Sequence, residues 1–186
     1  MKNCVEWLAV WFGAAKIGAI VCPVNTAYVG EGLAYQLDHS DSSILIVDDE
    51  YRDRFYNIVN SVPRVQQIVV RQTGEYQQEA GIQIGDLSTE IESNSTQPPP
   101  ECVLTPRDPA SILYTSGTTG RPKGCVLPQG QYLVAAEQMV LNCEYHSEDI
   151  LYTCLPLFHI NAQNYSVLAA MAARATVVLD DRFTAS

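Results

Sequence analysis

One stretch of ten residues combines glycines, hydroxyl side chains and cations in an order suited to holding phosphate groups. It runs from Thr115 to Gly124 and reads Thr-Ser-Gly-Thr-Thr-Gly-Arg-Pro-Lys-Gly. Its glycines let backbone N–H groups approach an oxyanion closely. Its hydroxyls can donate to phosphate oxygens. Lys123 adds a mobile positive charge, and Arg121 can add another. The stretch therefore predicts a site for a polyphosphate.

The charge of this region differs from that of the whole chain. The 186 residues hold 21 Asp and Glu against 11 Lys and Arg, a formal net charge of −10. Residues 109–136 hold no acid and carry a local charge of +2. The overall acidity argues against nucleic acid and anionic membranes as partners. The local cations favour a small polyanion, and the alternative is a flexible Gly/Thr turn on the surface.

The stretch is not a Walker A loop. That motif requires Gly-Lys followed by Ser or Thr at the start of a helix. Here Pro122 separates Arg121 from Lys123, and the following residues read as a strand. The phosphate groups would therefore be held by a loop between two strands.

Helix and strand patterns alternate on both sides of this loop. Apolar residues three and four apart predict a helix over 4–17, buried on most sides, capped by Asn3 and ended by Gly18. Further helices are expected at 31–39, 51–62, 131–142 and 161–173. Short apolar runs predict strands at 19–22, 44–47, 67–70, 110–114, 124–127, 150–154 and 175–179. This alternation favours an α/β fold with largely parallel sheets and flanking helices.

The domain organisation is expected to have three parts. Residues 1–92 form a first α/β part, 93–107 a Pro-rich linker, and 108–186 a second α/β part with the phosphate loop. The apolar run over 7–22 is too short for a membrane span. The six cysteines form no CxxC pair and are not spaced with the histidines as zinc ligands. We therefore expect reduced thiols in a cytoplasmic protein.

The loop resembles the phosphate-binding signature of the adenylate-forming superfamily. This superfamily includes acyl-CoA synthetases, luciferases and the adenylation domains of peptide synthetases. The similarity extends to residues 3–12, 16–20 and 23–25, and Leu155-Pro156-Leu157-Phe158-His159 resembles the next motif downstream. Residues 11–13, 158–160 and 174–176 are most similar to the crotonobetaine/carnitine–CoA ligase branch and its acyl-CoA ligase relatives. After Gly124 the chain departs from the family pattern of small apolar residues and Thr-His, since 125–129 reads Cys-Val-Leu-Pro-Gln.

The resemblance implies an ATP-dependent acyl-CoA ligase. A carboxylate and ATP give an acyl-adenylate and pyrophosphate, and the thiol of CoA then displaces AMP. His159 is implied to orient or gate the substrate, and the alternative is a strand-end histidine bonded to the backbone. Asn161 and Gln163 are weaker pocket candidates that can instead cap the following helix. Mg²⁺ is expected to bridge the phosphates. The residues implied to hold the β- and γ-phosphates are Thr115, Ser116, Gly117, Thr118, Thr119, Gly120 and Lys123.

Enzymes of this superfamily are much longer than 186 residues. We therefore expect this chain to be an inner piece of a larger N-terminal domain, with no turnover by itself. We also expect it to expose apolar surface through which it can self-associate. Three alternatives remain open: a non-catalytic module that binds ATP or phosphate, an inert truncation product, and a ligase that adenylates aryl or amino acids.

Overall fold

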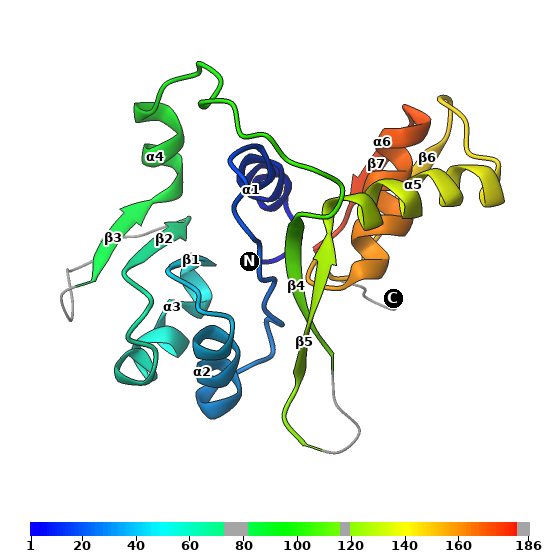
Figure 1. Cartoon of the computed structure of the whole chain (residues 1–186). Helices are drawn as coiled ribbons and strands as arrows, with labels where there is room; N and C mark the ends of the chain where they lie inside the picture. Colours follow the sequence, from blue (N-terminus) through cyan, green and yellow to red (C-terminus); the bar gives the residue numbers. More distant parts are fainter. Residues whose placement is uncertain (73–81, 116–119, 182–186) are drawn as a thin grey trace. The chain divides into compact units, whose positions relative to one another are not determined.

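The computed structural model describes residues 1–72, 82–115 and 120–181 (Figure 1). The chain divides into two compact units. One comprises Met1 with Val24–Pro98, and the other comprises Lys2–Pro23 with Pro99–Ser186. Among the described residues, the strands form one three-stranded and two two-stranded sheets.

The first unit is built on a parallel sheet. Strands β1 (Ile44–Asp48), β2 (Gln67–Arg71) and β3 (Gln83–Asp86) lie in the order β1-β2-β3. Parallel neighbours need a crossover between them, and between β1 and β2 this contains α3 (Asp49–Tyr56) and a 3-10 turn (Val59–Ser61). The other helices of this unit are α2 (Gly30–His39) and α4 (Leu87–Ser93).

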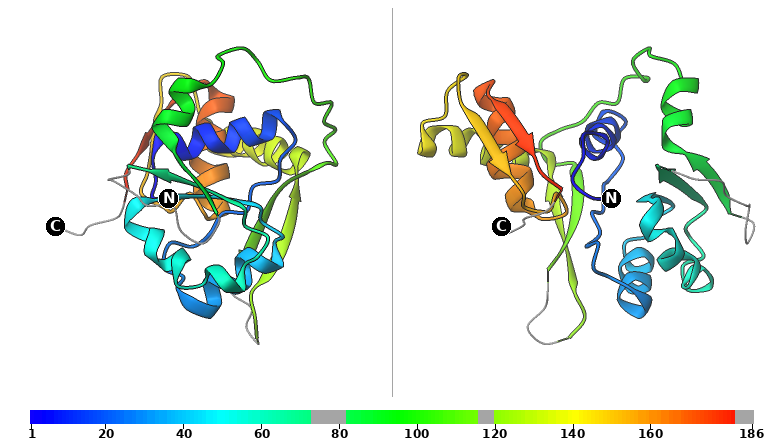
Figure 2. Two further views of the ribbon diagram at one scale, coloured as in Figure 1. Left: turned by 90° about the vertical axis from the view of Figure 1, so that its left-hand side faces the viewer. Right: turned by 180° about the vertical axis from the view of Figure 1, so that it is seen from behind.

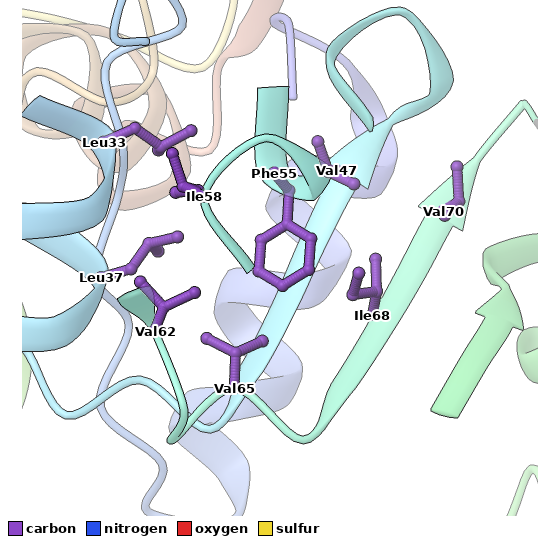
Figure 3. Close-up of a cluster of buried hydrophobic side chains, with 9 residues drawn as sticks. All are labelled: Leu33, Leu37, Val47, Phe55, Ile58, Val62, Val65, Ile68 and Val70. Carbon is purple, nitrogen blue, oxygen red and sulfur yellow. The ribbon is translucent and has the colours of Figure 1, made fainter. Parts of the chain in front are cut away.

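The core of the first unit lies between the sheet and the segments that contain α2, α3 and the 3-10 turn (Figure 3). Phe55 from α3 projects toward Val47, Ile68 and Val65, and only 1% of its surface is exposed. The cluster consists of Leu33, Leu37, Val47, Phe55, Ile58, Val62, Val65, Ile68 and Val70. Burying each large apolar side chain contributes about 1.5–3 kcal/mol, so this cluster supplies the main stabilisation of the first unit.

The second unit contains the phosphate-loop segment. Strands β4 (Pro109–Thr115) and β5 (Lys123–Pro128) are antiparallel, whereas β6 (Ile150–Thr153) and β7 (Thr176–Leu179) are parallel. Its helices are α1 (Val5–Lys16), α5 (Gln129–Cys143), a π-helical segment (Ala162–Leu168) and α6 (Ala169–Ala173). Figure 2 shows β4 and β5 as one long hairpin from two further directions.

The predicted α/β fold with parallel sheets and flanking helices is confirmed, with β4–β5 as an antiparallel addition. The strand expected at 19–22 is wrong, because only Val21 pairs with β4 and Pro23 has no N–H to extend the ladder. The helix expected at 51–62 ends at Tyr56 and gives way to the 3-10 turn. Strand β3 was not predicted, although Asp86 after it caps α4 by accepting a hydrogen bond from the Thr89 N–H.

Helix α1 is more exposed than its sequence suggests. Trp7 and Trp11 are buried, but Val5 is 73% exposed and Ile17 57% exposed. The prediction of a helix buried on most sides is therefore wrong for this chain. Gly18 ends the helix as expected, with a φ of 72° and its N–H donating to the Ala15 carbonyl.

Two further expectations can be compared with the fold. The six cysteines are all described; none is in a disulfide, and each is exposed or half-buried. Across residues 1–72, 82–115 and 120–181, we find no helix with both the length and the apolar character needed to cross a membrane.

Candidate functional site

The β4–β5 hairpin brings the two ends of the phosphate-loop segment together. Thr115 at the end of β4 pairs with Lys123 at the start of β5. Both side chains are exposed, as is Gly120, whose φ of 123° lies in a region that side chains disfavour. The hairpin thus places a hydroxyl and an ammonium group on paired residues. The other predicted phosphate ligands, Ser116, Gly117, Thr118 and Thr119, lie outside the described residues.

Close packing explains the glycine that follows Lys123. Gly124 pairs with Tyr114 across the hairpin. A Cβ at Gly124 would lie 2.9 Å from Cγ2 of Ile112 and 3.3 Å from Cζ of Tyr114. The Tyr114 ring therefore occupies the space of the missing side chain. Gly124 lets the two strands pair up to the loop.

Strand β4 is supported on both edges. On the side away from β5, the Val21 N–H donates to the Ala110 carbonyl at 3.1 Å, and the Ile112 N–H donates to the Val21 carbonyl at 2.9 Å. These two bonds form a parallel bridge between Val21 and Ser111. Strand β4, which leads into the phosphate loop, is therefore fixed by backbone hydrogen bonds along both of its edges.

Asn3 holds the segment that leads to His159. Its side-chain Nδ2 donates to the Leu155 carbonyl at 2.8 Å and to the Asp180 carbonyl at 2.9 Å. Its Oδ1 accepts from the Leu157 N–H at 2.8 Å. The prediction that Asn3 caps α1 is wrong, because the N-cap is Cys4 and no side chain caps the helix there. Asn3 instead joins three backbone groups more than 150 residues away.

His159 lies at the start of the helix that follows this segment. Its N–H donates to the Pro156 carbonyl at 3.0 Å, and its carbonyl accepts from the Gln163 N–H at 3.4 Å. The imidazole is exposed, with its centroid 4.5 Å from that of the Phe158 ring. The backbone of His159 is thus satisfied locally while the ring remains accessible. This is compatible with the predicted role in orienting a substrate.

The two weaker pocket candidates differ in their surroundings. Asn161 is exposed and makes no capping hydrogen bond. Gln163 is fully buried, and its side chain is bonded within the protein, so it does not line an open pocket. Asn161 directly precedes the π-helical segment and Gln163 lies within it. Such segments are often found near functional sites.

A buried chain of hydrogen bonds runs beneath the site. Ser111 Oγ and Tyr132 Oη lie 2.6 Å apart. Tyr132 Oη donates to Gln163 Oε1 at 2.8 Å, and Gln163 Nε2 donates to the Leu157 carbonyl at 2.8 Å. Burial raises the pKa of Tyr132, and the hydrogen bond with Ser111 opposes that rise. The sequence held one signal of this network, since Ser111 is a polar residue inside the otherwise apolar run Ala110–Leu113.

The ring of Tyr132 joins an aromatic cluster with α1. Its centroid is 5.3 Å from that of Trp11 in an edge-to-face arrangement. Trp11 also stacks on Phe12 at 5.1 Å and meets Trp7 edge-to-face at 5.5 Å. Such aromatic pairs contribute about 0.5–1.5 kcal/mol beyond their burial. They attach α1 to α5 next to the hydrogen-bonded chain.

Two surface hollows lie on the second unit, and neither is lined by a predicted site residue. One of about 370 Å³ lies among α1, α5 and α6 and is mostly apolar. The other, of about 550 Å³, lies around the turn between α5 and β6. Within the part of the chain that the structure describes, no three His, Cys, Asp or Glu residues form a cluster that could hold a metal ion.

The family model of AMP-binding enzymes matches residues 1–186, the full length of the chain. The chain belongs to the AMP-binding enzyme family. Its curated relatives in this family include the crotonobetaine/carnitine–CoA ligase of Escherichia coli O17:K52:H18, which is 32% identical over 193 residues. That alignment covers 100% of this chain and 35% of the ligase. The chain therefore spans about a third of the length of the curated relatives it matches.

Solved structures that include a CoA ligase contain the fold of this AMP-binding chain as part of their length. The anthranilate CoA ligase AuaEII in complex with anthranoyl-AMP superposes with a TM-score of 0.90 at 26% identity, covering 98% of this chain and 34% of that one. The N-terminal domain of FACL13 from Mycobacterium tuberculosis, bound to an inhibitor, gives a TM-score of 0.85 at 26% identity. It matches 99% of this chain and 43% of that structure. The recognition of the adenylate-forming superfamily from the sequence is thus confirmed.

Proposed function

We propose that this chain is the phosphate-binding part of an ATP-dependent acyl-CoA ligase. The observation that carries the proposal is the signature Thr115–Gly124, whose ends are paired across the β4–β5 hairpin of a chain that matches the AMP-binding family throughout. The relatives named above, which are CoA ligases, support the same reaction class.

The chemistry would proceed in two steps. A carboxylate oxygen of the acid attacks the α-phosphorus of ATP, the bond to the bridging oxygen breaks, and pyrophosphate leaves. The sulfur of CoA then attacks the carbonyl carbon of the acyl-adenylate, AMP leaves with the bonding electrons, and the thiol proton passes to solvent. Negative charge grows on pyrophosphate during the first step. Fixed donors and a cation near the β- and γ-phosphates would stabilise that charge.

In this proposal the phosphate ligands are the residues of the signature. The ammonium of Lys123 and the hydroxyl of Thr115, on paired residues, would approach the phosphates from the two strands. Gly120 would allow close approach of the backbone. Ser116, Gly117, Thr118 and Thr119 would complete the loop. His159 would orient or gate the acid, since its ring is exposed while its backbone is anchored.

The proposed Mg²⁺ would arrive with ATP and bridge its phosphates. Residues 109–136 contain no carboxylate, and the described residues hold no cluster of metal ligands. The described residues therefore offer no metal site of their own, and no step of the proposal depends on one. The role of the chain toward Mg²⁺ would be limited to orienting the phosphates.

The class of the acid follows from the relatives rather than from a pocket in this chain. The similarity to crotonobetaine/carnitine–CoA ligase favours an aliphatic carboxylate as the acid, and the similarity to the anthranilate CoA ligase structure favours an aryl acid. We propose the aliphatic class and keep the aryl class as the alternative.

Titration of the chain with ATP·Mg²⁺ by calorimetry tests phosphate binding. Charge-assisted hydrogen bonds contribute about 1.5–3 kcal/mol, so Lys123→Ala should weaken binding by about tenfold or more. Lys16→Ala is the matched control, because it removes the same charge from an exposed site in the same unit. An equal loss in both variants would show non-specific attraction. Saturable binding by the chain together with an inactive chimera in the next assay would favour a non-catalytic module, and no binding would favour an inert truncation product.

Ligation requires a second assay, because the chain spans 35% of its curated relative. We expect the 186 residues by themselves to form no acyl-CoA. A chimera in which they replace the matching segment of the Escherichia coli ligase should form thioester from CoA, ATP and aliphatic acids. Because the parent ligase supplies the rest of the chimera, a shift of acid preference relative to that parent, toward aryl or amino acids, would favour the alternative ligase. Turnover by the isolated chain would refute the expectation of inactivity.

We also propose that the isolated chain self-associates through apolar surface. Large apolar side chains stand exposed on α5 and on the β6–β7 sheet, among them Leu133, Leu141 and Ile150 at 63%, 69% and 70%. Exposed apolar side chains promote association where they gather into a patch. Sedimentation at increasing protein concentration should show oligomers. A monomer at all concentrations that also binds no hydrophobic dye would contradict this.

A further inference from the structure

We infer that Tyr132 is a positioning residue that couples strand β4 to the segment carrying His159. The coupling runs through the buried hydrogen-bonded chain from Ser111 to Leu157. The inference rests on the proposed function, because Thr115 and His159 need a common alignment only if both contact the reactants.

The Leu157 carbonyl, which ends this series of hydrogen bonds, determines the direction of every bond in the series. The Leu157 carbonyl can only accept, so the Gln163 amide turns its nitrogen toward Leu157 and its oxygen toward Tyr132. Tyr132 must then donate its one hydroxyl proton to Gln163. The phenolic oxygen is left as an acceptor, so Ser111 donates to it. The result is a one-way series of donors from β4 to Leu157.

Burial makes this series costly to break. Ser111, Tyr132, Gln163 and Leu157 are 1%, 5%, 0% and 1% exposed. A buried polar group without a partner loses its hydration without compensation. The raised pKa of Tyr132 keeps its hydroxyl protonated and able to donate. The four groups therefore move together or lose their bonds.

The two ends of the series lie next to the two predicted parts of the site. Ser111 is four residues before Thr115 on the same strand, a distance of about 13 Å along extended backbone. Leu157 is two residues before His159. A shift of one end relative to the other would change how the phosphate loop and His159 face a common substrate. Small misplacements of this kind can strongly reduce rates.

NMR spectroscopy of the 186-residue chain tests the coupling. Tyr132→Phe removes the hydroxyl and keeps the ring against Trp11. The chain has three histidines, so His39 and His146 serve as internal references for His159. We expect the variant to shift the His159 ring signals and the Thr115 amide signal, with the two reference histidines unmoved. Tyr165→Phe is the matched control, because its side chain is 49% exposed beside Gln163.

A rescue variant separates positioning from stability. In the Gln163→Glu variant, the protonated carboxyl group can accept from Tyr132 and donate to Leu157. The ionised carboxylate cannot donate. Its Thr115 signal should therefore approach that of the wild type as the pH falls, when both are compared at each pH. Tyr132→Phe lacks the hydroxyl at every pH and should show no such recovery.

Three outcomes would overturn the inference: unmoved His159 and Thr115 signals, equal shifts at all three histidines, or absence of rescue. If Tyr132→Phe does not fold, Ser111→Ala is judged by the same signals, because it removes only the first donor. ATP·Mg²⁺ titration is run in parallel, and Tyr132→Phe should weaken binding about three- to tenfold. A wild-type chain that binds no ATP refutes the proposed function, whereas the His159 and Thr115 signals separately decide the coupling.

Discussion

Replacement of Asn3 by alanine should destabilise the second unit far more than its place near the N-terminus suggests. The side chain makes three hydrogen bonds to the backbone around Leu157. Two are to exposed carbonyls, for which water can substitute, so each contributes about 0.5–1 kcal/mol. The third satisfies the N–H of Leu157, which is 1% exposed. Leaving that N–H unpaired costs about 1–3 kcal/mol. The total is about 2–5 kcal/mol.

Tryptophan fluorescence during urea unfolding measures this loss. The chain has two tryptophans, Trp7 and Trp11, and both are buried on α1 in the second unit. Their emission therefore reports the unit that Asn3 holds. With a slope of about 1.5 kcal/mol per molar urea, Asn3→Ala should lower the midpoint by about 1–3 M. The slope itself should change little, because the variant removes no buried apolar surface.

Asn3→Asp separates the donor from the acceptor role. In this variant a carboxylate can still accept from the Leu157 N–H. It would also lie against the carbonyl oxygens of Leu155 and Asp180, which accept hydrogen bonds from the Asn3 amide in the wild type. Ionisation is therefore disfavoured in the folded state, and the variant should regain stability as the pH falls and the carboxyl is protonated. Asn142→Ala, at an exposed position of α5, is the control and should stay within about 0.5 kcal/mol of the wild type. If Asn3→Ala behaves like this control, the assignment of Asn3 as an anchor of the His159 segment is wrong.

Two pairs of variants probe other parts of the second unit. Gly124→Ala should lower stability by about 1–3 kcal/mol, because its Cβ would overlap Ile112 and Tyr114, whereas Gly13→Ala on α1 meets nothing within 4 Å and should be neutral or stabilising. Equal effects in the urea assay would refute the packing argument. The hydrogen bond to the Asp180 carboxylate raises the pKa of Tyr152 to about 12. The stability from this bond should be complete below pH 10 and be lost as the pH rises toward 12. Ultraviolet titration of the wild type against Tyr152→Phe should reveal the late-titrating group, and Asp180→Asn should abolish it.

Much of the fold follows from local patterns along the chain. Helical patterns and short apolar runs depend on neighbours in sequence, and they predicted α2, α5, β1, β2, β4, β5, β6 and β7 to within a few residues. Strand β3 was missed because its four residues include Gly85 and two polar side chains. It forms a strand because β2 offers it a parallel edge, and that edge is not visible in the residues themselves.

Only part of the candidate site, likewise, could be predicted from local sequence. The residue types of the loop from Thr115 to Gly124 indicated a phosphate site beside the alternative of a surface turn, since donors, glycines and a cation lie within ten residues. The family resemblance added the identity of ATP and the role of His159. Neither could predict the link between the loop strand and His159. That link depends on Ser111, Tyr132 and Gln163, which lie up to 52 residues apart in the sequence.

Asn3 makes the distinction clear. Its position before an apolar run is typical of a helix cap, and a side-chain amide suits that role. In the folded chain the same amide lies within 2.9 Å of three backbone groups, two in the segment after β6 and one directly after β7. Local chemistry thus specified which groups could bind phosphate and which segments would be helix or strand. The partners of Ser111 and Gln163 were settled by burial, because a polar group removed from water must bond to whatever the fold brings near it. The partners of Asn3 were settled by which distant backbone groups the fold brings next to its amide.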